Sequence, residues 1–367
     1  MTNRTPYDFH TLLCPVPAAA RFEDPEYFIW CGTAVRGDDG RCHMYYSRWP
    51  RRLGFHAWVS HSEVAYAVAD SPFGPWRHAG LALPARSGQY WDGDCTHNPT
   101  VLRAEEDGRY YLYYMGNRGD GVATPGQLNW THRNNQRIGV AVADQPEGPW
   151  RRFDAPIIDS TPGFYDALCC ANPSVTARHA RHGGGYLMVY KAVNDRGAMP
   201  FGGPVLHCVA LSESPAGPFI KQPQPVFISE GTHFAAEDPF IWRLDEAGAK
   251  TDADTDAIGY RAIVKDMGGY FTGRGRSLAL FESTDGLNWN LARCPFVSGT
   301  EILWQSESES AEPRRQMLHA LERPQLLFAD SHAERGCHRT PQALFCAAEA
   351  LDGTTFNVQI PLATGRL

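Results

Sequence analysis

The sequence lacks any long apolar run. No stretch approaches the about 18 consecutive apolar residues of a membrane-spanning helix. The N-terminal stretch "MTNRTPYDFHTLLCPVP" at 1–17 has no apolar core of about 7–15 residues, which a signal peptide requires. These absences argue against a membrane partner and predict a cytoplasmic protein.

Positive charge and paired cysteines are also scarce. The 34 Lys and Arg residues are outnumbered by 41 Asp and Glu, the net charge is −7, and no basic block occurs, so nucleic acid is not an expected partner. The ten cysteines contain no CxxC pair, and the adjacent Cys169 and Cys170 are poorly placed to bond to each other. We expect mostly reduced, buried thiols, as in a cytoplasmic protein.

Long helical periodicity is missing, and so are several catalytic motifs. The chain has no Gly-Lys-Ser/Thr, HExxH or GxSxG, which argues against nucleotide hydrolysis, zincin chemistry and serine-hydrolase chemistry. The Gly-rich stretch "GYFTGRGRS" at 269–277 follows a strand-like run, but no helix follows it. We therefore expect no phosphate-cradling loop there.

The composition favours a large packed core. Hydrophobic residues make up 43% and charged residues 20% of the 367 residues, and a single β-barrel or propeller can reach this length. Aromatic residues make up 12%. Rings in this number suit strands and sugar-stacking surfaces, although packing is the commoner role of any one ring.

A short phrase recurs five times: a polar or charged residue, then Pro, then an apolar run. The copies are "EDPEYFIW" at 23–30, "HNPTVLR" at 97–103, "ANPSVTA" at 171–177, "EDPFIWR" at 237–243 and "ERPQLLF" at 322–328. A second phrase ends in turn residues and lies between these copies. Its copies are "VADSPFGPW" at 68–76, "VADQPEGPW" at 142–150, "ALSESPAGPF" at 210–219 and "FESTDGLNW" at 281–289. Runs with high β-propensity lie between the two phrases.

Each unit therefore contains four predicted strands. Five units predict an all-β fold over residues 1–367: a single five-bladed β-propeller, with four-stranded antiparallel blades around a central funnel. The blades are expected to begin near residues 24, 98, 172, 238 and 323. Two β-sandwiches would fit the five-fold phrase poorly.

The units are longer than simple propeller repeats, and one unit is incomplete. The excess lies in insertions at 83–96, 117–136 and 244–258, and insertions on one face usually build a binding site. Blade five lacks a final strand at its C-terminal end. We expect the N-terminal segment around "DFHTLLCPV" at 8–16 to supply that strand and close the ring.

The polar residues beside each Pro are the first candidate site residues, because the first strand of each propeller blade lines the axis. Pro fixes its own φ and favours an extended geometry in the preceding residue. A single such dipeptide is typical of a turn or a solvated ion pair, but repetition in register favours function. The residues are Glu23, Asp24, His97, Asn98, Asn172, Glu237, Asp238, Glu322 and Arg323.

Three further stretches contribute polar candidates. "YWDGDCTHN" at 90–98 precedes an axial strand, "FYDAL" at 164–168 lies just before Asn172, and "VKDMGG" at 264–269 lies in blade four. A structural reading is also open for each, since Asp-Gly favours turns and a strand Lys often pairs with an acid. The candidates are Trp91, Asp92, Asp94, Asp166, Lys265 and Asp266.

Carboxylates gathered at one funnel are the equipment of glycoside hydrolysis. One protonates the leaving oxygen, and the other activates water or attacks the sugar. The acid must keep its proton near neutral pH, which burial or a neighbouring carboxylate achieves by raising its pKa. Glu237 has such a neighbour in Asp238.

The five phrases, in their blade order, resemble the five-bladed glycoside hydrolase clan of family 43 and its relatives, families 32, 68, 117 and 130. The resemblance covers about residues 20–360, and blade order carries more of it than any single motif. Family 43 enzymes are mostly inverting hydrolases of arabinose-, xylose- or galactose-containing glycans. The resemblance implies Asp24 of "FEDPEYF" as base and Glu237 of "AEDPFIW" as acid.

One position departs from the family pattern. A third family Asp tunes the pKa of the acid, and the matching phrase "ANPSV" has Asn172 there, whose amide supplies no negative charge. Either Asp238, Asp166 or Asp94 takes that role, or the mechanism differs. The "HNP" and "ERPQLL" phrases look more like divergent relatives near family 117.

We therefore expect an inverting, exo-acting glycosidase that removes a terminal sugar from an oligo- or polysaccharide. The Asp24 and Glu237 carboxyl groups should lie about 6.5–9.5 Å apart. Residues expected to hold the sugar, or to assist as alternative acids and bases, are Asp94, Asp166, Asp238, Glu322, His97, Asn98, Asn172, Lys265, Asp266, Arg323 and Trp91.

Three alternatives stay open: a retaining transglycosidase, a phosphorylase with Arg323 and Lys265 as a small anion pocket, and a non-catalytic carbohydrate-binding propeller. We expect no required cofactor. An ion in the central channel, near His97 or His319, is an open possibility. The sugar, its linkage and anomer, and the oligomeric state stay open.

Overall fold

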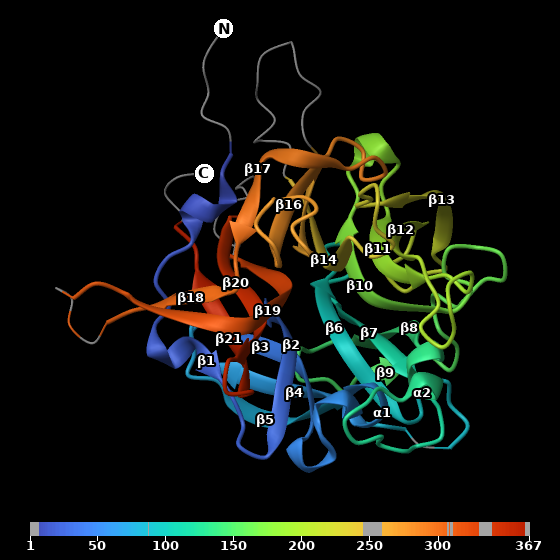
Figure 1. The fold of residues 1–367 in the computed structure, drawn as a ribbon, viewed down its shortest axis with the longest axis horizontal. Coiled ribbons are helices and arrows are strands. Elements are labelled where there is room, and N and C mark those ends of the chain that lie inside the picture. Colours follow the sequence, from blue (N-terminus) through green and yellow to red (C-terminus); the bar gives the residue numbers. More distant parts are fainter. Residues whose placement is uncertain are drawn as a thin grey trace, which may run out of the picture.

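The structure is a computed structural model that describes residues 7–86, 88–244, 259–306, 308, 311–329 and 340–363. Five antiparallel sheets are arranged around a central axis, which confirms the predicted all-β, five-bladed propeller (Figure 1). Residues 245–258 of one predicted insertion, and Cys337, lie outside the described residues. The other nine cysteines are free thiols.

The first four sheets follow the chain in order, from the axis outward. Blade one contains β2 (Tyr27–Arg36), β3 (Cys42–Pro50), β4 (Glu63–Ala69) and β5 (Arg77–Leu83). Blade two contains β6 (Cys95–Arg103), β7 (Tyr110–Asn117), β8 (Arg137–Ala143) and β9 (Arg151–Arg152). Blade three contains β10 (Cys169–Ala177), β11 (Tyr186–Val193), β12 (Val205–Ser212) and β13 (Ile220–Val226). Blade four contains β14 (Ala236–Arg243), β15 (Tyr260–Asp266), β16 (Ser277–Ser283) and β17 (Asn290–Ser298).

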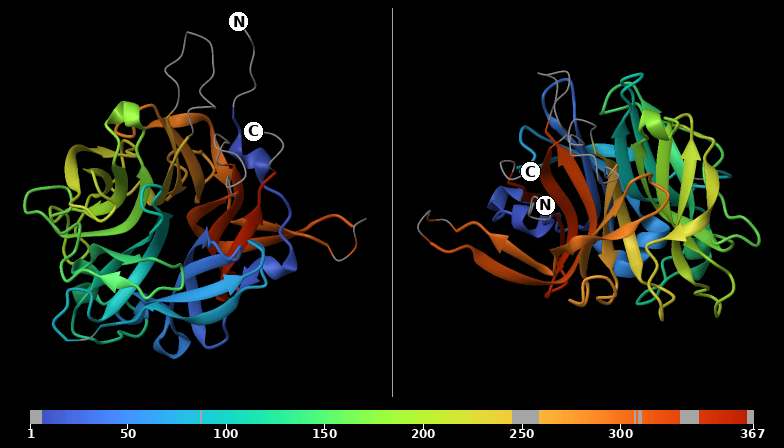
Figure 2. Two further views of the ribbon diagram at one scale, coloured as in Figure 1. Left: turned by 180° about the vertical axis from the view of Figure 1, so that it is seen from behind. Right: turned by 90° about the horizontal axis from the view of Figure 1, so that it is seen from above.

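Blade five combines both ends of the chain. Its strands are β19 (Arg314–Phe328), β20 (Pro341–Ala350), β21 (Thr355–Pro361) and the short N-terminal β1 (Arg21–Phe22). β1 pairs antiparallel with β21, and Leu13 forms a further bridge to Leu362. β18 (Glu301–Trp304) pairs with the beginning of β19 in a hairpin that projects from the body of the propeller (Figures 1 and 2).

Helices are few and short in the described part of the chain. The two α-helices are α1 (Trp58–His61) and α2 (Trp130–Asn134). The 3₁₀ turns are η1 (Phe9–Leu12), η2 (Ala18–Ala20), η3 (Arg51–Leu53), η4 (Phe55–Ala57) and η5 (Ala180–His182). None of these helices has the length and apolar character needed to cross a membrane.

The first strands of the blades form a closed circle. β2, β6, β10, β14 and β19 each contact the two neighbouring inner strands (Figure 2). In each, two residues interrupt the pairing with the second strand, and the first of the two has a positive φ. These first residues are Cys31 (55°), Asn98 (53°), Asn172 (51°), Asp238 (54°) and Arg323 (55°).

This geometry corrects two sequence-based expectations. The extended conformation predicted before each Pro is wrong for Asn98 and its counterparts, which are left-handed because each lies in a bulge of its strand. In blade one, the position that matches Asn98 is Cys31, followed by Gly32, and not Asp24. The phrase with Asp24 and Pro25 comes just before β2, so its apparent register with the other blades is wrong.

Candidate functional site

The five left-handed residues form a hydrogen-bonded chain around the axis, which we call the axial ring. The Cys31 thiol donates to Asn98 Oδ1 (2.9 Å), and Asn98 Nδ2 donates to Asn172 Oδ1 (2.6 Å). Asn172 Nδ2 donates to Asp238 Oδ1 (2.5 Å), which also accepts a longer bond from Arg323 Nη1 (3.4 Å). Each blade therefore places one polar side chain at the same level of the axis.

The axial ring is sealed from solvent. All five of its residues are buried, and none is more than 6% exposed. Burial and the charge of Glu237 raise the pKa of Asp238, against the opposing charge of Arg323. Because the ring residues are buried and bonded to one another, they form a floor beneath the funnel. The polar residues expected to hold sugar hydroxyls at Asn98, Asn172 and Arg323 belong to this floor.

Directly beside the ring lie four charged residues, the lysine–glutamate cluster: Lys191, Glu237, Lys265 and Glu322. Lys191 Nζ lies 2.9 Å from Glu237 Oε1, and Lys265 Nζ lies 3.2 Å from Glu237 Oε2. The same Lys265 Nζ lies 2.6 Å from Glu322 Oε1. One ammonium therefore joins carboxylates from two neighbouring blades.

Strand register places these four side chains together. Glu237 and Glu322 each immediately precede an axial-ring residue. Lys265 on β15 is the cross-strand partner of Glu237, and Lys191 on β11 is the equivalent partner of Ala171 in blade three. Because Ala171 is small, the Lys191 side chain is able to extend across to Glu237 of the next blade.

The two glutamates have opposite electrostatic environments. Burial alone would raise the pKa of Glu237, but the charges of Lys191 and Lys265 outweigh burial and hold this pKa well below its usual value. Burial raises the pKa of Glu322, and Lys265 opposes that shift only in part because Asp238 and Glu237 add to it. Glu237 is therefore ionised over a wide pH range, whereas Glu322 keeps its proton to higher pH than an ordinary glutamate.

Aromatic side chains lie beside the cluster, on blades one and two. Trp30 and His97 occupy the positions equivalent to Glu237, and His97 lies against Trp58 with ring centroids 5.0 Å apart. Phe55 packs edge-on against Trp30 at 5.7 Å. His97 Nδ1 bonds to Ser62 Oγ (2.7 Å), and burial lowers the pKa of His97 well below its usual value. This imidazole is therefore neutral and fixed in place.

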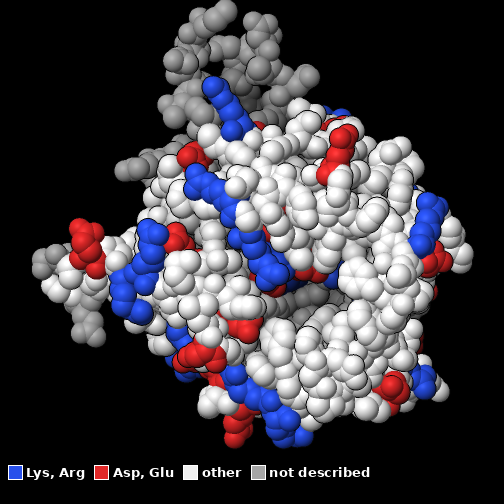
Figure 3. All heavy atoms as spheres, in the orientation of Figure 1, with Lys and Arg blue, Asp and Glu red and all other residues white. Residues whose placement is uncertain are grey.

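The space-filling view shows a hollow near the centre of the molecule, with acidic and basic side chains around it (Figure 3). Solvent reaches the cluster, since the side chains of Glu237, Glu322 and Lys191 are 18%, 14% and 13% exposed. A hollow bordered by carboxylates and ammonium groups is suited to a polar ligand such as a carbohydrate, whose hydroxyl groups can hydrogen-bond to both.

Asp24 lies away from this arrangement, in the connection between β1 and β2. Its Oδ1 accepts the backbone N–H groups of Glu26 and Tyr27, and Arg51 Nε donates to its backbone carbonyl. Its contacts within the described part of the chain are thus those of a turn-stabilising Asp. None of these described contacts joins Asp24 to the lysine–glutamate cluster.

We expect Asp24→Asn to leave turnover within about twofold of the wild type, because Asn keeps the Oδ1 acceptor and the change is remote from the cluster. Steady-state kinetics on any accepted substrate would measure it. A loss of activity in a variant with unchanged melting temperature would restore Asp24 as the base.

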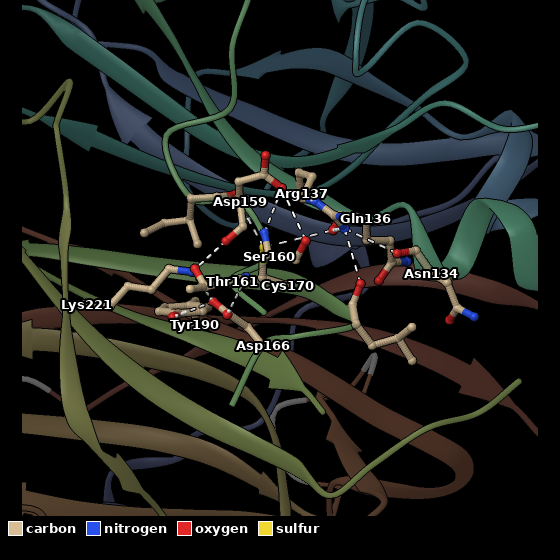
Figure 4. Close-up of polar contacts among 12 residues, drawn as sticks. Asn134, Gln136, Arg137, Asp159, Ser160, Thr161, Asp166, Cys170, Tyr190 and Lys221 are labelled. Atoms are coloured by element: carbon tan, nitrogen blue, oxygen red, sulfur yellow. Dashed lines mark hydrogen bonds and ion pairs between the residues drawn. The ribbon is translucent and has the colours of Figure 1, made fainter. Parts of the chain in front are cut away.

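Asp166 and Asp92 are equivalent loop anchors. Asp166 is fully buried and accepts from Thr161 N (3.1 Å), Tyr190 Oη (2.9 Å) and Lys221 Nζ (2.5 Å) (Figure 4). In blade two, buried Asp92 likewise bonds to a strand tyrosine, Tyr114, at 2.7 Å. These carboxylates fix the segments that precede β10 and β6, and they face neighbouring strands instead of the cluster.

Two more predicted site residues have packing or turn roles. Trp91 stacks on Tyr114, with ring centroids 5.7 Å apart, and belongs to the apolar contact between blades one and two. Asp94 is half-buried, and its Oδ2 accepts the backbone N–H of Gly119. Neither has a described contact with the lysine–glutamate cluster.

Asp266 organises the loop between β15 and β16. Its fully buried carboxylate accepts the backbone N–H groups of residues 268–272 and the Thr272 hydroxyl. Asp266 therefore fixes the Gly-rich loop beside Lys265, and its own oxygens are already occupied.

Asp266→Ala should lower the free energy of unfolding by at least about 2 kcal/mol, because several buried N–H donors would lose their acceptor. Chemical denaturation would measure this loss. Asp266→Asn, which retains one acceptor oxygen, should be less damaging, and an Ala variant as stable as the wild type would contradict this role.

The sequence analysis missed Lys191, Trp30 and Cys31. A usable signal for Lys191 was present, since "YLMVYKAV" and "YRAIVKDM" place a Lys at the same point of the second strand in blades three and four. Trp30 and Cys31 stand in "WCGT", which parallels "HNPT" with Gly in place of Pro.

A metal site is not evident in the part of the chain that the structure describes. There, no group of three or more His, Cys, Asp or Glu side chains is placed to hold an ion. His97 has its ring nitrogens near Ser62 and Cys31, and His319 is exposed on β19. An ion in the central channel stays a prediction.

Comparisons with known proteins agree with this geometry at the level of the fold. The structure of Zg3597, a family 117 glycoside hydrolase of the marine bacterium Zobellia galactanivorans, matches with a TM-score of 0.62 and 16% identity. The match covers 93% of this chain and 88% of that one. The chain has the fold of the five-bladed propeller glycoside hydrolases. The fold that the sequence phrases implied is thus confirmed.

Two other structures match with lower scores. A thermostable family 43 glycoside hydrolase matches with a TM-score of 0.52 and 14% identity, over 96% of this chain and 92% of that one. An α-L-arabinofuranosidase from Lactobacillus brevis matches with a TM-score of 0.52 and 12% identity, over 93% and 92%. No known family model and no curated protein matches the sequence.

Proposed function

We propose that this protein is a glycoside hydrolase in which Glu322 is the proton donor and Glu237 is the ionised carboxylate partner. The observation that carries the proposal is the pair of carboxylates joined by Lys265 Nζ beside a partly solvent-accessible hollow. The raised pKa of Glu322 and the lowered pKa of Glu237 supply the two protonation states that glycosidic cleavage requires. The fold shared with known glycoside hydrolases supports the same reaction class.

This assignment differs from the sequence-based one. Glu237 was expected to be the acid, but two ammonium groups hold it ionised, so it is unsuited to donate a proton. Glu322, which the sequence analysis gave as an alternative acid or base, has the environment of the acid. Asp24 has no part in this proposal.

The separation of the carboxylates supports a retaining mechanism. Glu237 Oε2 and Glu322 Oε1 contact the same Nζ atom, so these two oxygen atoms lie at most about 6 Å apart, close to the separation that retention requires. Retaining enzymes have carboxyl groups about 5–5.5 Å apart and inverting enzymes about 6.5–9.5 Å apart. In this mechanism Glu237 attacks the anomeric carbon while Glu322 protonates the leaving oxygen; Glu322, then deprotonated, activates the water that releases the sugar.

An exo mode of action is also part of the proposal. The burial of the axial-ring side chains, which bond to one another across the axis, supports a hollow that is blind in its centre. A blind hollow accepts the end of a glycan more readily than its middle. Transfer of the sugar to a second sugar in place of water is the second candidate outcome, which the same covalent intermediate would permit.

A release assay tests the proposal. The purified protein would be incubated with aryl α- and β-glycosides of arabinofuranose, xylose, galactose, galactofuranose, fucose, glucuronic acid and galacturonic acid, with and without phosphate. Early NMR spectra of the released sugar should show the anomeric configuration of the substrate. Release with the opposite configuration would refute retention, and binding of glycans without release of any sugar would favour a carbohydrate-binding propeller.

A further inference from the structure

Lys191 has unused binding capacity in the hollow. Its ammonium carries three N–H donors, and among the described residues its partner is Glu237 Oε1 alone. Lys265, in contrast, is shared between two carboxylates and is only 5% exposed. Two donors of Lys191 thus remain for a bound group, at the edge of the proposed catalytic pair.

The charges around Lys191 favour an anion once the proton donor is protonated. Three cations, Lys191, Lys265 and Arg323, face three carboxylates, Glu237, Asp238 and Glu322. The nearby imidazoles are neutral, since burial lowers the pKa of His207 to about 3 and that of His97 well below its usual value. Protonation of Glu322, which proton donation requires, leaves this group with an excess of positive charge in a partly desolvated site.

The protein as a whole is negatively charged, so any attraction for an anion must come from the local excess of positive charge around Lys191. The chain has a net charge of −7, so an anionic ligand gains nothing from the molecule as a whole. Attraction would come from the cations of the lysine–glutamate cluster and from Arg323. Arg323, to which the sequence assigned anion binding, is buried in the axial ring and bonded to Asp238, so Lys191 is the better-placed contact.

We propose that the hollow selects an acidic sugar, whose carboxylate is bound by Lys191 on the ring that carries the scissile bond. This inference rests on the proposed hydrolase function. Lys191 Nζ lies 2.9 Å from the carboxylate assigned to attack the anomeric carbon, so a group that it contacts lies close to that carbon. A carboxylate there would form a charge-assisted hydrogen bond, which a neutral hydroxymethyl group cannot match.

Matched aryl glycosides test the proposal directly. Each anomer of a glucuronide is compared with the corresponding glucoside, and each galacturonide with the corresponding galactoside, so that the members of a pair differ only at the carboxylate. The wild type should prefer the acidic member in kcat/KM by about 10- to 100-fold, as expected for one hydrogen bond to a charged group. Equal or higher kcat/KM for the neutral members would overturn the proposal.

Substitution of Lys191 separates substrate recognition from support of Glu237. Lys191→Gln should reduce kcat/KM for the acidic member about 10- to 100-fold more than it reduces kcat/KM for the neutral member, so the preference of the wild type is lost. Lys191→Arg should keep the preference. If Lys191 serves only to hold Glu237 ionised, Lys191→Gln would slow both members equally and the preference would persist. That result would overturn the proposal even if the hydrolase function stands.

Binding measurements cover the case in which no aryl glycoside is cleaved. Calorimetric titration of the wild type with free glucuronic and galacturonic acid, the neutral sugars and inorganic phosphate should show tighter binding of the acids, lost in Lys191→Gln. Such a result with no turnover would sustain the acidic-sugar site and refute the hydrolase. Lys191-dependent binding of phosphate with phosphate-dependent cleavage of neutral glycosides would assign the anion to a co-substrate and overturn the proposal.

Discussion

Glu322→Gln should reduce turnover of substrates with poor leaving groups by about 10²- to 10⁴-fold, the usual contribution of general acid catalysis. The amide has the size of the carboxyl group but delivers no proton to the leaving oxygen. Aryl glycosides whose phenol is already a strong acid need little protonation, so their cleavage should fall far less. A plot of rate against the pKa of the leaving phenol would therefore become steeper in the variant.

The pH profile gives a second readout of the same substitution. Activity needs protonated Glu322, whose pKa is raised, and ionised Glu237, whose pKa is lowered. Activity should therefore decline as pH rises through the pKa of Glu322, above the usual range of a glutamate, and this alkaline decline should vanish in Glu322→Gln. Glu301→Gln, on the exposed hairpin of the same blade, is the matched control. An equal loss for every leaving group would remove Glu322 from the role of acid.

Glu237→Ala should abolish hydrolysis, with a loss of about three orders of magnitude or more, because the attacking carboxylate is gone. Azide added to this variant should restore cleavage and yield a glycosyl azide of inverted configuration, since the small anion occupies the vacated position. NMR of the product would identify it. Rescue by azide with retained configuration, or full activity without azide, would contradict the role given to Glu237.

Stability must be measured alongside that loss. Removing one partner of a largely buried ion pair typically costs about 3–5 kcal/mol, and here two ammonium groups would be left facing each other. The double variant Glu237→Ala with Lys191→Met should recover part of the stability that Glu237→Ala loses, and none of the activity. Recovery of stability without recovery of activity would show that the loss of turnover comes from the missing carboxylate and not from unfolding.

The repeated phrases were sufficient to predict the architecture, and they located four of the five axial-ring residues. Asn98, Asn172, Asp238 and Arg323 were recognisable because Pro follows each of them. Blade one was misread because Gly32 replaces Pro after Cys31, while an unrelated Asp-Pro turn precedes the strand. Gly and Pro both fit a bulge that lacks a ladder hydrogen bond, but only one of them was sought.

The assignment of acid and base could not be read from the sequence, because it depends on contacts between blades. Lys191 belongs to blade three and Glu237 to blade four, and only the register of two separate hairpins brings them together. The proposed reassignment of Glu237 from acid to ionised carboxylate rests on that contact. Likewise, no local sequence feature distinguishes Asp166 and Asp266, whose carboxylates hold loops, from Glu322, whose carboxylate is partly exposed beside Lys265.

The pairing of β1 with β21 has a consequence for how the protein is made. The first strand of the chain finds its partner only after nearly all of the remaining residues have been synthesised. At about 5–20 residues per second, the N-terminal segment stays without its partner strand for tens of seconds on the ribosome. An unpaired strand edge invites association with other chains, so protection of the nascent chain during this interval should govern the yield of native protein.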